Sequence, residues 1–305
     1  MDSRQGVLLV LGTALISGVS IFLNKFALST IEPFTFTFLK NALVGVFLLA
    51  FLFVRKDFGQ LRLLNQKQWM QLAGIGVLGG GIPFLLFFHG LSLTNAAAGS
   101  FLQKTMFLFV AAIGMIFLRD KIPQKIWIPT ILLITGGYLL AKLNGFTFGE
   151  GELFVLAATL FWAVEIHVSK RVLANVSGNM VAAARMSIGA LAIFAFLVIT
   201  GRVETIAHVT PDGWVWVAFT SLLLLGYVTT FYNGLKLIKP TTATALLVVG
   251  SPITTLLGMV FSNAPLAMNI IGGIILILSG AALYVWWNEL GPGAKAHLAS
   301  PLARI

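Results

Sequence analysis

Ten long apolar runs, separated by short loops, dominate this sequence of 305 residues. Each run holds about 20 residues, the length that an α-helix needs to cross the hydrocarbon core of a bilayer. Lipid offers no partner for open strand edges, and a barrel needs shorter, alternating strands, so the runs predict helices. The predicted spans are 6–28, 33–54, 69–88, 95–118, 124–142, 152–171, 178–200, 213–235, 241–262 and 266–287. The sequence therefore predicts an all-α integral membrane protein of ten transmembrane helices.

The composition agrees with lipid as the main solvent. Hydrophobic residues make up 58% of the chain and charged residues 10%, whereas a soluble domain carries about 25% charged residues. The net charge of +10 comes from Lys and Arg in short loops between apolar runs, so we expect no nucleic-acid partner. The chain has no cysteine, which excludes thiol catalysis and thiolate metal sites. No two histidines are four residues apart, so we predict no metal site and no cofactor.

The basic residues are distributed unevenly between the two sets of loops. If the N-terminus is cytoplasmic, fourteen basic residues fall on the cytoplasmic side, and only Lys142 and Arg202 fall on the outer side. Cytoplasmic loops carry the excess of Lys and Arg in membrane proteins. The bias predicts a multi-pass protein of the cell membrane with both termini in the cytoplasm and a cytoplasmic tail at 291–305.

The two halves of the chain resemble each other at an offset of 144 to 145 residues. Residues 17–25 align with 162–170, residues 89–93 align with 233–237, and Lys40 falls over Arg185. Five spans in each copy mean that the second copy enters the membrane from the opposite side. Inverted repeats are a recurring plan of secondary transporters, with a substrate site between the copies. We therefore expect two inverted five-helix repeats, at 1–145 and 146–290.

Four segments resemble a known transporter family. They are FHGLSLTNAAAGS (88–100), FWAVEIHVSKRVL (161–173), YNGLKLIKPTTATAL (232–246) and GSPITTLLGMVF (250–261). Together with the two five-helix halves, they are similar to the EamA-type transporters of the drug/metabolite transporter superfamily. The resemblance implies alternating access, with spans 1–4 and 6–9 lining a central cavity and spans 5 and 10 packing outside. Lys104 and Thr105 stand where this family often has a proline.

Ionisable residues deep in a span are the best candidates for a binding or coupling site, because burying a charge in lipid is costly. Lys104 and Glu165 lie closest to mid-depth, with Gln103 beside Lys104 and Trp162 on the face of Glu165. The structural alternative is a buried ion pair. If Lys104 approaches Glu165 in one conformation only, Glu165 can change protonation between the two sides of the membrane. Coupling to protons or to a counter-substrate is therefore expected.

Lys40 and Arg185 are the next deepest and occupy equivalent positions of the repeat. They are either contacts to substrate or gate, or structural partners of helix ends. Lys25 and Lys170 lie near span ends, and we expect their side chains to reach the membrane interface. Ser251, beside Pro252 in the ninth span, and Tyr227 complete the candidate site.

The function favoured by these features is a secondary transporter of a small organic metabolite, an amino acid or a related carboxylate-bearing solute, working as an exporter. A flippase for lipid or lipid-linked sugar has the same architecture and stays open as an alternative. A membrane-embedded enzyme would need a catalytic cluster, and we identify no catalytic residue. The predicted partners are a small-molecule substrate and membrane lipid, with a homodimer left open.

The absence of cysteine allows the predicted topology to be tested directly. We expect Ser3→Cys to be protected from an impermeant thiol reagent in intact cells, because both termini are predicted to be cytoplasmic. Asn144→Cys, in the loop after the fifth span, should be labelled from outside. Labelling of Ser3→Cys with protection of Asn144→Cys would reverse the orientation.

Overall fold

The computed structural model describes residues 3–56, 59, 64–119, 123–142, 148–263 and 265–291. Ten helical segments in this part of the chain are long and apolar enough to cross a membrane. Five of the spans are dominated by one uninterrupted helix, and they are α1 (Ser3–Ala27), α2 (Pro33–Val54), α8 (Glu150–Val172), α9 (Gly178–Ile199) and α10 (Pro211–Leu237). The prediction of an all-helical ten-span fold is confirmed.

The other five spans change geometry along their length or at one end. The third span contains α3 (Gln66–Ile75), the π-helix η2 (Gly76–Gly81) and α4 (Ile82–Leu93). The fourth contains α5 (Ala96–Lys104) and α6 (Met106–Phe117), and the ninth contains α11 (Pro240–Leu247) and α12 (Gly250–Ser262). The fifth contains η3 (Gln124–Ile126) and α7 (Trp127–Lys142), and the tenth contains α13 (Met268–Val285) and η5 (Trp286–Leu290). A short 3-10 helix, η4 (Val203–Ile206), lies between α9 and α10.

The contacts between helices follow the internal repeat. Helix α1 packs along α10, and α4 packs along α8, so the first span meets the eighth and the third meets the sixth. Replacing each span by its equivalent in the other repeat, five spans away, converts the contact of spans 1 and 8 into the contact of spans 6 and 3. Helix α2 packs on α9, and α7 packs on α13, so each of these pairs maps onto itself. This pattern is the pseudo-two-fold relation expected of two inverted five-helix repeats.

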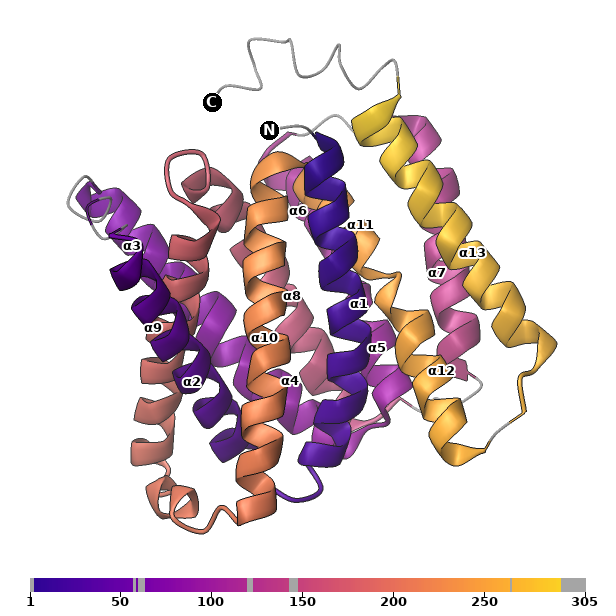
Figure 1. The fold of residues 1–305 in the computed structure, drawn as a ribbon. Helices are drawn as coiled ribbons and strands as arrows, with labels where there is room; N and C mark the ends of the chain where they lie inside the picture. Colours follow the sequence, from indigo (N-terminus) through magenta and orange to yellow (C-terminus); the bar gives the residue numbers. More distant parts are fainter. Residues whose placement is uncertain are drawn as a thin grey trace.

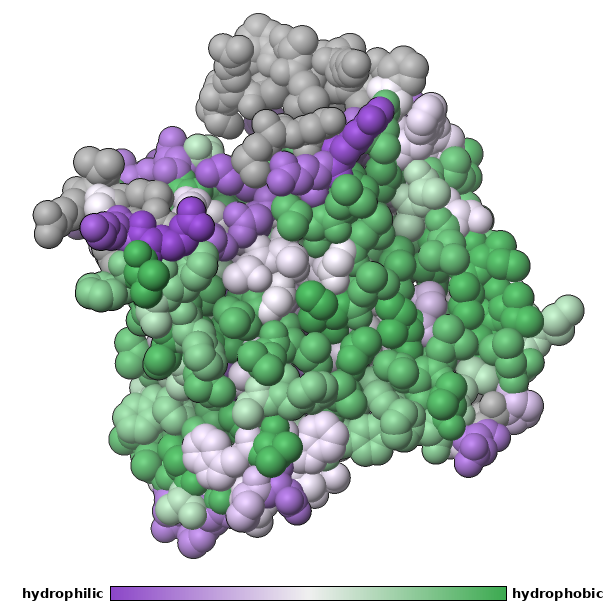
Figure 2. Space-filling model, viewed as in Figure 1, coloured by the Kyte–Doolittle hydropathy of each residue, from purple (hydrophilic) through white to green (hydrophobic). Residues whose placement is uncertain are grey.

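Helices α7 and α13 lie together at one side of the bundle (Figure 1), which agrees with the expected position of the fifth and tenth spans. The outward surface has a broad apolar band, and hydrophilic residues gather toward the end where α1 begins (Figure 2). Large apolar side chains in this band, such as Leu8, Val46 and Leu191, are more than 60% exposed. Such a surface suits lipid as the surrounding solvent.

The third span, Gln66–Leu93, extends beyond the predicted segment 69–88 at both ends, and the helix continues through its glycines as η2. Gly80 lies against α9 so closely that a Cβ atom there would meet Arg185 O at 2.0 Å. A Cβ atom on Gly189 of α9 would lie 2.5 Å from the carbonyl carbon of Gly80. Small residues let membrane helices approach this closely, so Gly80 and Gly189 allow the third span to pack tightly on α9.

We expect Gly80→Ala to destabilise the protein by about 1–3 kcal/mol, because the added methyl group overlaps the backbone of α9. The matched control is Gly74→Ala in the same span, where an added Cβ meets nothing within 4 Å. Thermal unfolding in detergent should show a lower Tm for Gly80→Ala and no loss for Gly74→Ala. Equal Tm values for the two variants would contradict the packing described here.

Candidate functional site

A small cavity lies between the two repeats. Its volume is about 60 Å³, far below the roughly 300–1,000 Å³ of a typical small-molecule site. It is therefore contracted in this conformation. We call it the central cavity, and its lining residues are Ser17, Ser20, Ile21, Asn24, Lys40, Phe84, Phe87, Phe88, Gln103, Met106, Trp162, Glu165, Ile166, Arg185, Leu224, Tyr227 and Phe231.

The second repeat contributes a buried chain of polar groups to this cavity. Tyr232 donates its hydroxyl proton to Glu165 Oε1 at 2.7 Å, and Arg185 Nη1 donates to the Tyr232 hydroxyl at 3.1 Å. Ser169 also donates to Glu165, and Arg185 Nη2 donates to Gly79 O at 3.0 Å. The positive charge of Arg185 is thus connected to the negative charge of Glu165 through one tyrosine.

The first repeat contributes a similar cluster around Lys40. Lys40 Nζ donates to Asn24 Oδ1 at 2.8 Å, and Asn24 Nδ2 donates to Ser20 Oγ at 3.1 Å. The ammonium group also lies 4.8 Å from the ring centroids of Phe36 and of Phe88, within range of a cation–π interaction. Lys40 is buried, and these three partners are all neutral.

The two clusters occupy equivalent positions of the sequence repeat. The offset of 145 residues that places Lys40 over Arg185 also pairs Ser20 with Glu165, Asn24 with Ser169 and Lys25 with Lys170. At the offset of 144 residues that aligns 89–93 with 233–237, Phe88 falls over Tyr232. The first repeat therefore has a serine and a phenylalanine where the second repeat has the carboxylate and the bridging tyrosine. The two clusters lie at equivalent positions, but only the cluster of the second repeat contains a carboxylate beside its cation.

Lys104 is the last residue of α5, where the fourth span breaks, and it lies beside the central cavity without being part of its lining. Its Nζ donates to Ser17 Oγ at 2.5 Å and to Gln103 Oε1 at 3.0 Å. The expected approach of Lys104 to Glu165 is not made in this conformation, since the ion pair that the described residues form, Arg202 with Glu32, lies elsewhere. The sequence placed both residues at one site, but it could not show their partners.

The remaining candidates divide between the cavity wall and its surroundings. Trp162 and Tyr227 line the cavity, and Trp162 Nε1 donates to Gly79 O at 2.8 Å. The π-helix supplies this carbonyl, as π-bulges often do at functional sites. Ser251 is buried 3.5 Å from the Ser100 hydroxyl and does not line the cavity. The ninth span therefore contributes no residue to the described lining, contrary to the expectation for spans 6–9.

Lys25 and Lys170 are partly buried, and both bind carbonyl groups at helix ends. Lys25 Nζ donates to the carbonyl oxygens of Leu91 and Ser92, both at 2.9 Å. Lys170 Nζ donates to the carbonyl oxygens of Leu235 and Ile238, both at 2.8 Å. Each lysine caps the end of a helix of its own repeat, because the last carbonyl groups of a helix lack partners within the helix.

Sequence reasoning missed three polar residues of the site, Ser17, Ser20 and Asn24 on α1. They share one helix face at spacings of three and four residues, and all three line the central cavity. The signal that could have found them is the repeat, because Ser20 and Asn24 fall over Glu165 and Ser169. Among the described residues, no group of three His, Cys, Asp or Glu side chains could hold a metal ion.

A second hollow connects Glu165 to one end of the bundle. This groove has a volume of about 530 Å³, and it begins at Gln66 and Lys67, where α3 starts. Its remaining lining is mostly apolar and comes from Met70, Gln71, Gly74, Ile75, Leu78 and Val168, with Glu165 as a shared member. Glu165 lines both the groove and the central cavity, so it stands between them.

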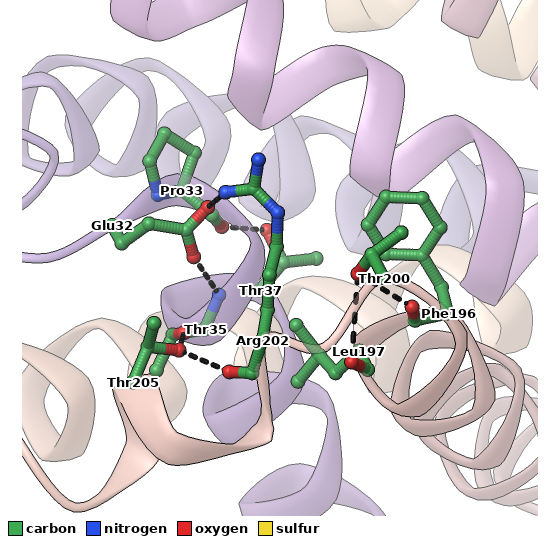
Figure 3. Close-up of polar contacts among 9 residues, drawn as sticks. All are labelled: Glu32, Pro33, Thr35, Thr37, Phe196, Leu197, Thr200, Arg202 and Thr205. Atoms are coloured by element: carbon green, nitrogen blue, oxygen red, sulfur yellow. Dashed lines mark hydrogen bonds and ion pairs between the residues drawn. The ribbon is translucent and has the colours of Figure 1, made fainter.

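At the opposite end of the bundle, the α1–α2 and α9–α10 connections contact each other (Figure 3). Arg202 Nη1 lies 3.2 Å from Glu32 Oε1, and the same carboxylate accepts from Thr35 N at 2.7 Å. The hydroxyl groups of Thr35 and Thr205 are hydrogen-bonded to each other. This loop contact joins the first repeat to the second.

The chain is similar to proteins of archaea and bacteria. A protein of Methanothermobacter thermautotrophicus named as an uncharacterized transporter is 24% identical over 220 residues, which are 66% of this chain and 63% of that protein. The uncharacterized transporter YyaM of Bacillus subtilis (strain 168) is 21% identical over 282 residues, which are 89% of this chain and 90% of YyaM. A solved crystal structure matches 98% of this chain with a TM-score of 0.72 at 20% identity, a likeness that concerns the fold.

A model of the EamA-like transporter family matches the sequence twice, at residues 4–142 and at residues 149–286. Each match covers one set of five spans. The expected resemblance is therefore confirmed over almost the whole chain, and the protein belongs to the EamA-like transporter family.

Proposed function

We propose that this protein is a secondary transporter that exports a small carboxylate-bearing organic solute by alternating access. The observation that carries the proposal is the position of Glu165, which lines both the central cavity and a groove leading to one end of the bundle. Glu165 is shared by the two hollows, and a joined pair of loops lies at the other end. In alternating access, the repeats rock around a central site and expose it to each end in turn. The named transporters among the relatives agree with this reading.

The direction of transport follows from the charge bias. The groove opens at the end where α1 and α3 begin (Figure 1), which the loop charges predict to be cytoplasmic. A solute entering there would meet Glu165 before the other residues of the central cavity. This arrangement favours loading from the cytoplasm and release outside.

A flippase is the second candidate, and one observation favours it. The groove wall includes Met70, whose side chain is 69% exposed on the surface of α3. A lipid tail could follow such an apolar wall. The abundance of buried polar and charged groups in the central cavity favours a small polar solute instead.

We propose that Glu165 links transport to protons. Its hydrogen bonds from Tyr232 and Ser169 hold this arrangement. Opening the cavity separates some of these partners and changes the environment of the carboxylate. Glu165 of α8 lines both hollows. Its carboxyl group can therefore exchange a proton with one side of the membrane in one conformation and with the other side in the other conformation.

The test of both ideas is transport by purified protein in proteoliposomes. A thermal-shift screen of amino acids and organic acids first identifies a solute that raises Tm. We expect a pH gradient to accelerate transport of that solute by the native protein, and we expect Glu165→Gln to lose the acceleration. Glu150→Gln, on the exposed first turn of the same helix, is the control and should behave like the native protein. An equal response of Glu165→Gln and native protein would remove Glu165 as the coupling group.

The loop contact gives an independent test of alternating access. The hydrogen-bonded hydroxyl groups of Thr35 and Thr205 place the two Cβ atoms near the spacing that a disulfide needs. In this chain without cysteine, we expect Thr35→Cys/Thr205→Cys to cross-link on oxidation and to stop transport, because the loops can no longer separate. Reduction should restore transport, and each single variant should stay active. Full transport by the cross-linked protein would show that this end does not need to open.

A further inference from the structure

The lining of the central cavity carries an excess of one positive charge. Its charged residues are Lys40, Arg185 and Glu165, two cations and one carboxylate. The other acidic residues that the structure describes lie at the ends of spans or in η4, and they are Glu32, Glu150, Glu152, Glu204, Asp212 and Glu289. An uncompensated buried charge is strongly unfavourable, so one further negative charge is needed to balance this lining.

The excess charge is located at Lys40. Glu165 is already connected to Arg185 through the Tyr232 hydroxyl. At the position of the first repeat that is equivalent to Glu165, the chain has Ser20, which carries no charge. Lys40 thus has the place of Arg185 in the repeat without the carboxylate that accompanies Arg185. A bound solute can supply the missing anion.

The two cations also have hydrogen-bond donors without acceptors. A lysine ammonium has three N–H donors, and Lys40 gives one of them to an oxygen, that of Asn24, while the rings of Phe36 and Phe88 lie beside the same ammonium. Arg185 Nε is buried, and the described residues offer it no acceptor. Both groups belong to the lining. A surplus of donors beside a surplus of positive charge is matched by a carboxylate, which accepts on both of its oxygens.

Aromatic side chains form a large part of the cavity wall. Six of the seventeen lining residues are aromatic, whereas aromatic residues make up 12% of the whole chain. They form two groups of neighbouring rings, which are Phe84, Phe87, Phe88 and Trp162 on α4 and α8, and Tyr227 and Phe231 on α10. Centroid distances between neighbouring rings are 5.3–5.8 Å in the first group and 5.9 Å in the second. Aromatic rings attract one another at these distances.

The aromatic wall gives a reason for the solute to contain a ring. The cavity of about 60 Å³ is too small for an organic solute, so binding must accompany its opening. Opening exposes aromatic surface that the contracted cavity keeps covered. A ring on the solute can cover this surface again, by stacking or edge-to-face contact with the wall.

On the basis of the proposed transport function, we propose that the solute is an aromatic monocarboxylate without an amino group, and that Lys40 binds its carboxylate. One negative charge balances the lining. An aromatic amino acid is zwitterionic and would leave the excess charge in place. To bind its ammonium group, Glu165 would have to give up its hydrogen bonds from Tyr232 and Ser169. A dianion would replace the positive excess with a negative one.

The experiment compares three solutes, of which two differ from the first by a single group. The first is 3-phenyllactate, which has one ring and one negative charge. Phenylalanine has an ammonium group in place of its hydroxyl group, and lactate lacks its ring. The full chain is reconstituted in proteoliposomes loaded with unlabelled solute, and counterflow of the same radiolabelled solute is measured against protein-free liposomes. We expect 3-phenyllactate counterflow to exceed that of either other solute at least tenfold.

Two variants test the role of Lys40. Lys40→Gln should reduce 3-phenyllactate counterflow tenfold or more. Ser20→Glu keeps the lysine and adds the missing carboxylate. Ser20 binds Asn24, the partner of Lys40, so we expect the new carboxylate to balance Lys40 and to reduce counterflow at least tenfold. Lys125→Gln, which changes an exposed lysine outside the cavity, is the control and should change nothing.

A binding measurement separates loss of the anion site from loss of the transport cycle. We expect 3-phenyllactate to raise the Tm of the native protein and of Lys125→Gln in detergent. It should not raise the Tm of Lys40→Gln or of Ser20→Glu. The Tm of each variant without solute shows whether that variant is folded, and the comparison of the three solutes on the native protein does not depend on any variant.

Each contrary outcome overturns a different statement. Phenylalanine counterflow equal to or above that of 3-phenyllactate would overturn the monoanion and leave the transporter intact. Equal counterflow of lactate and 3-phenyllactate would overturn the role of the ring. Unchanged counterflow and Tm shift in folded Lys40→Gln would overturn the assignment of Lys40. Movement of labelled lipid with no counterflow of any of the three solutes would instead overturn the proposed transport function.

Discussion

The fold depends on giving every charge inside the membrane a partner. Lys25 and Lys170 are bound to the carbonyl groups at helix ends, and Arg185 is linked to a carboxylate through a tyrosine. Each arrangement lowers the cost of keeping a charge away from water. Lys40 lines the central cavity and Lys104 lies beside it, and the partners that the described residues offer to both are neutral. The distribution of unbalanced charge therefore locates the site better than depth in the membrane does.

The sequence predicted the spans and the repeat because both depend on features of the chain itself. Length and apolarity define a transmembrane helix, and the offset that aligned Lys25 with Lys170 reappears as the same helix-capping contact in both halves. The deep residues Lys40, Glu165 and Arg185 were found for the same reason, since an ionisable group in an apolar run is visible without a structure.

Partners and helix breaks were harder to predict. The partner of Glu165 is Tyr232, and no sequence rule separates this tyrosine from the aromatic residues that only pack. The approach of Lys104 to Glu165 was inferred from depth alone, and rotation about the helix axis directs Lys104 toward Ser17 instead. The π-helix at Gly76–Gly81 gave no sequence signal beyond its glycines, although its carbonyl groups bind Trp162 and Arg185.

Divergence between the two repeats gives the symmetric scaffold a direction and a preference. Both halves keep a cation and a short polar side chain at equivalent positions, Lys40 with Asn24 and Arg185 with Ser169. Only the second half has a carboxylate at this position, Glu165, and Glu165 also lines the groove that leads to one end of the bundle. A perfectly symmetric cavity would treat its two ends alike. Placing the internal counter-charge on one side leaves the other side to be completed by the solute, so the same substitution that separates the repeats also defines what the cavity can accept.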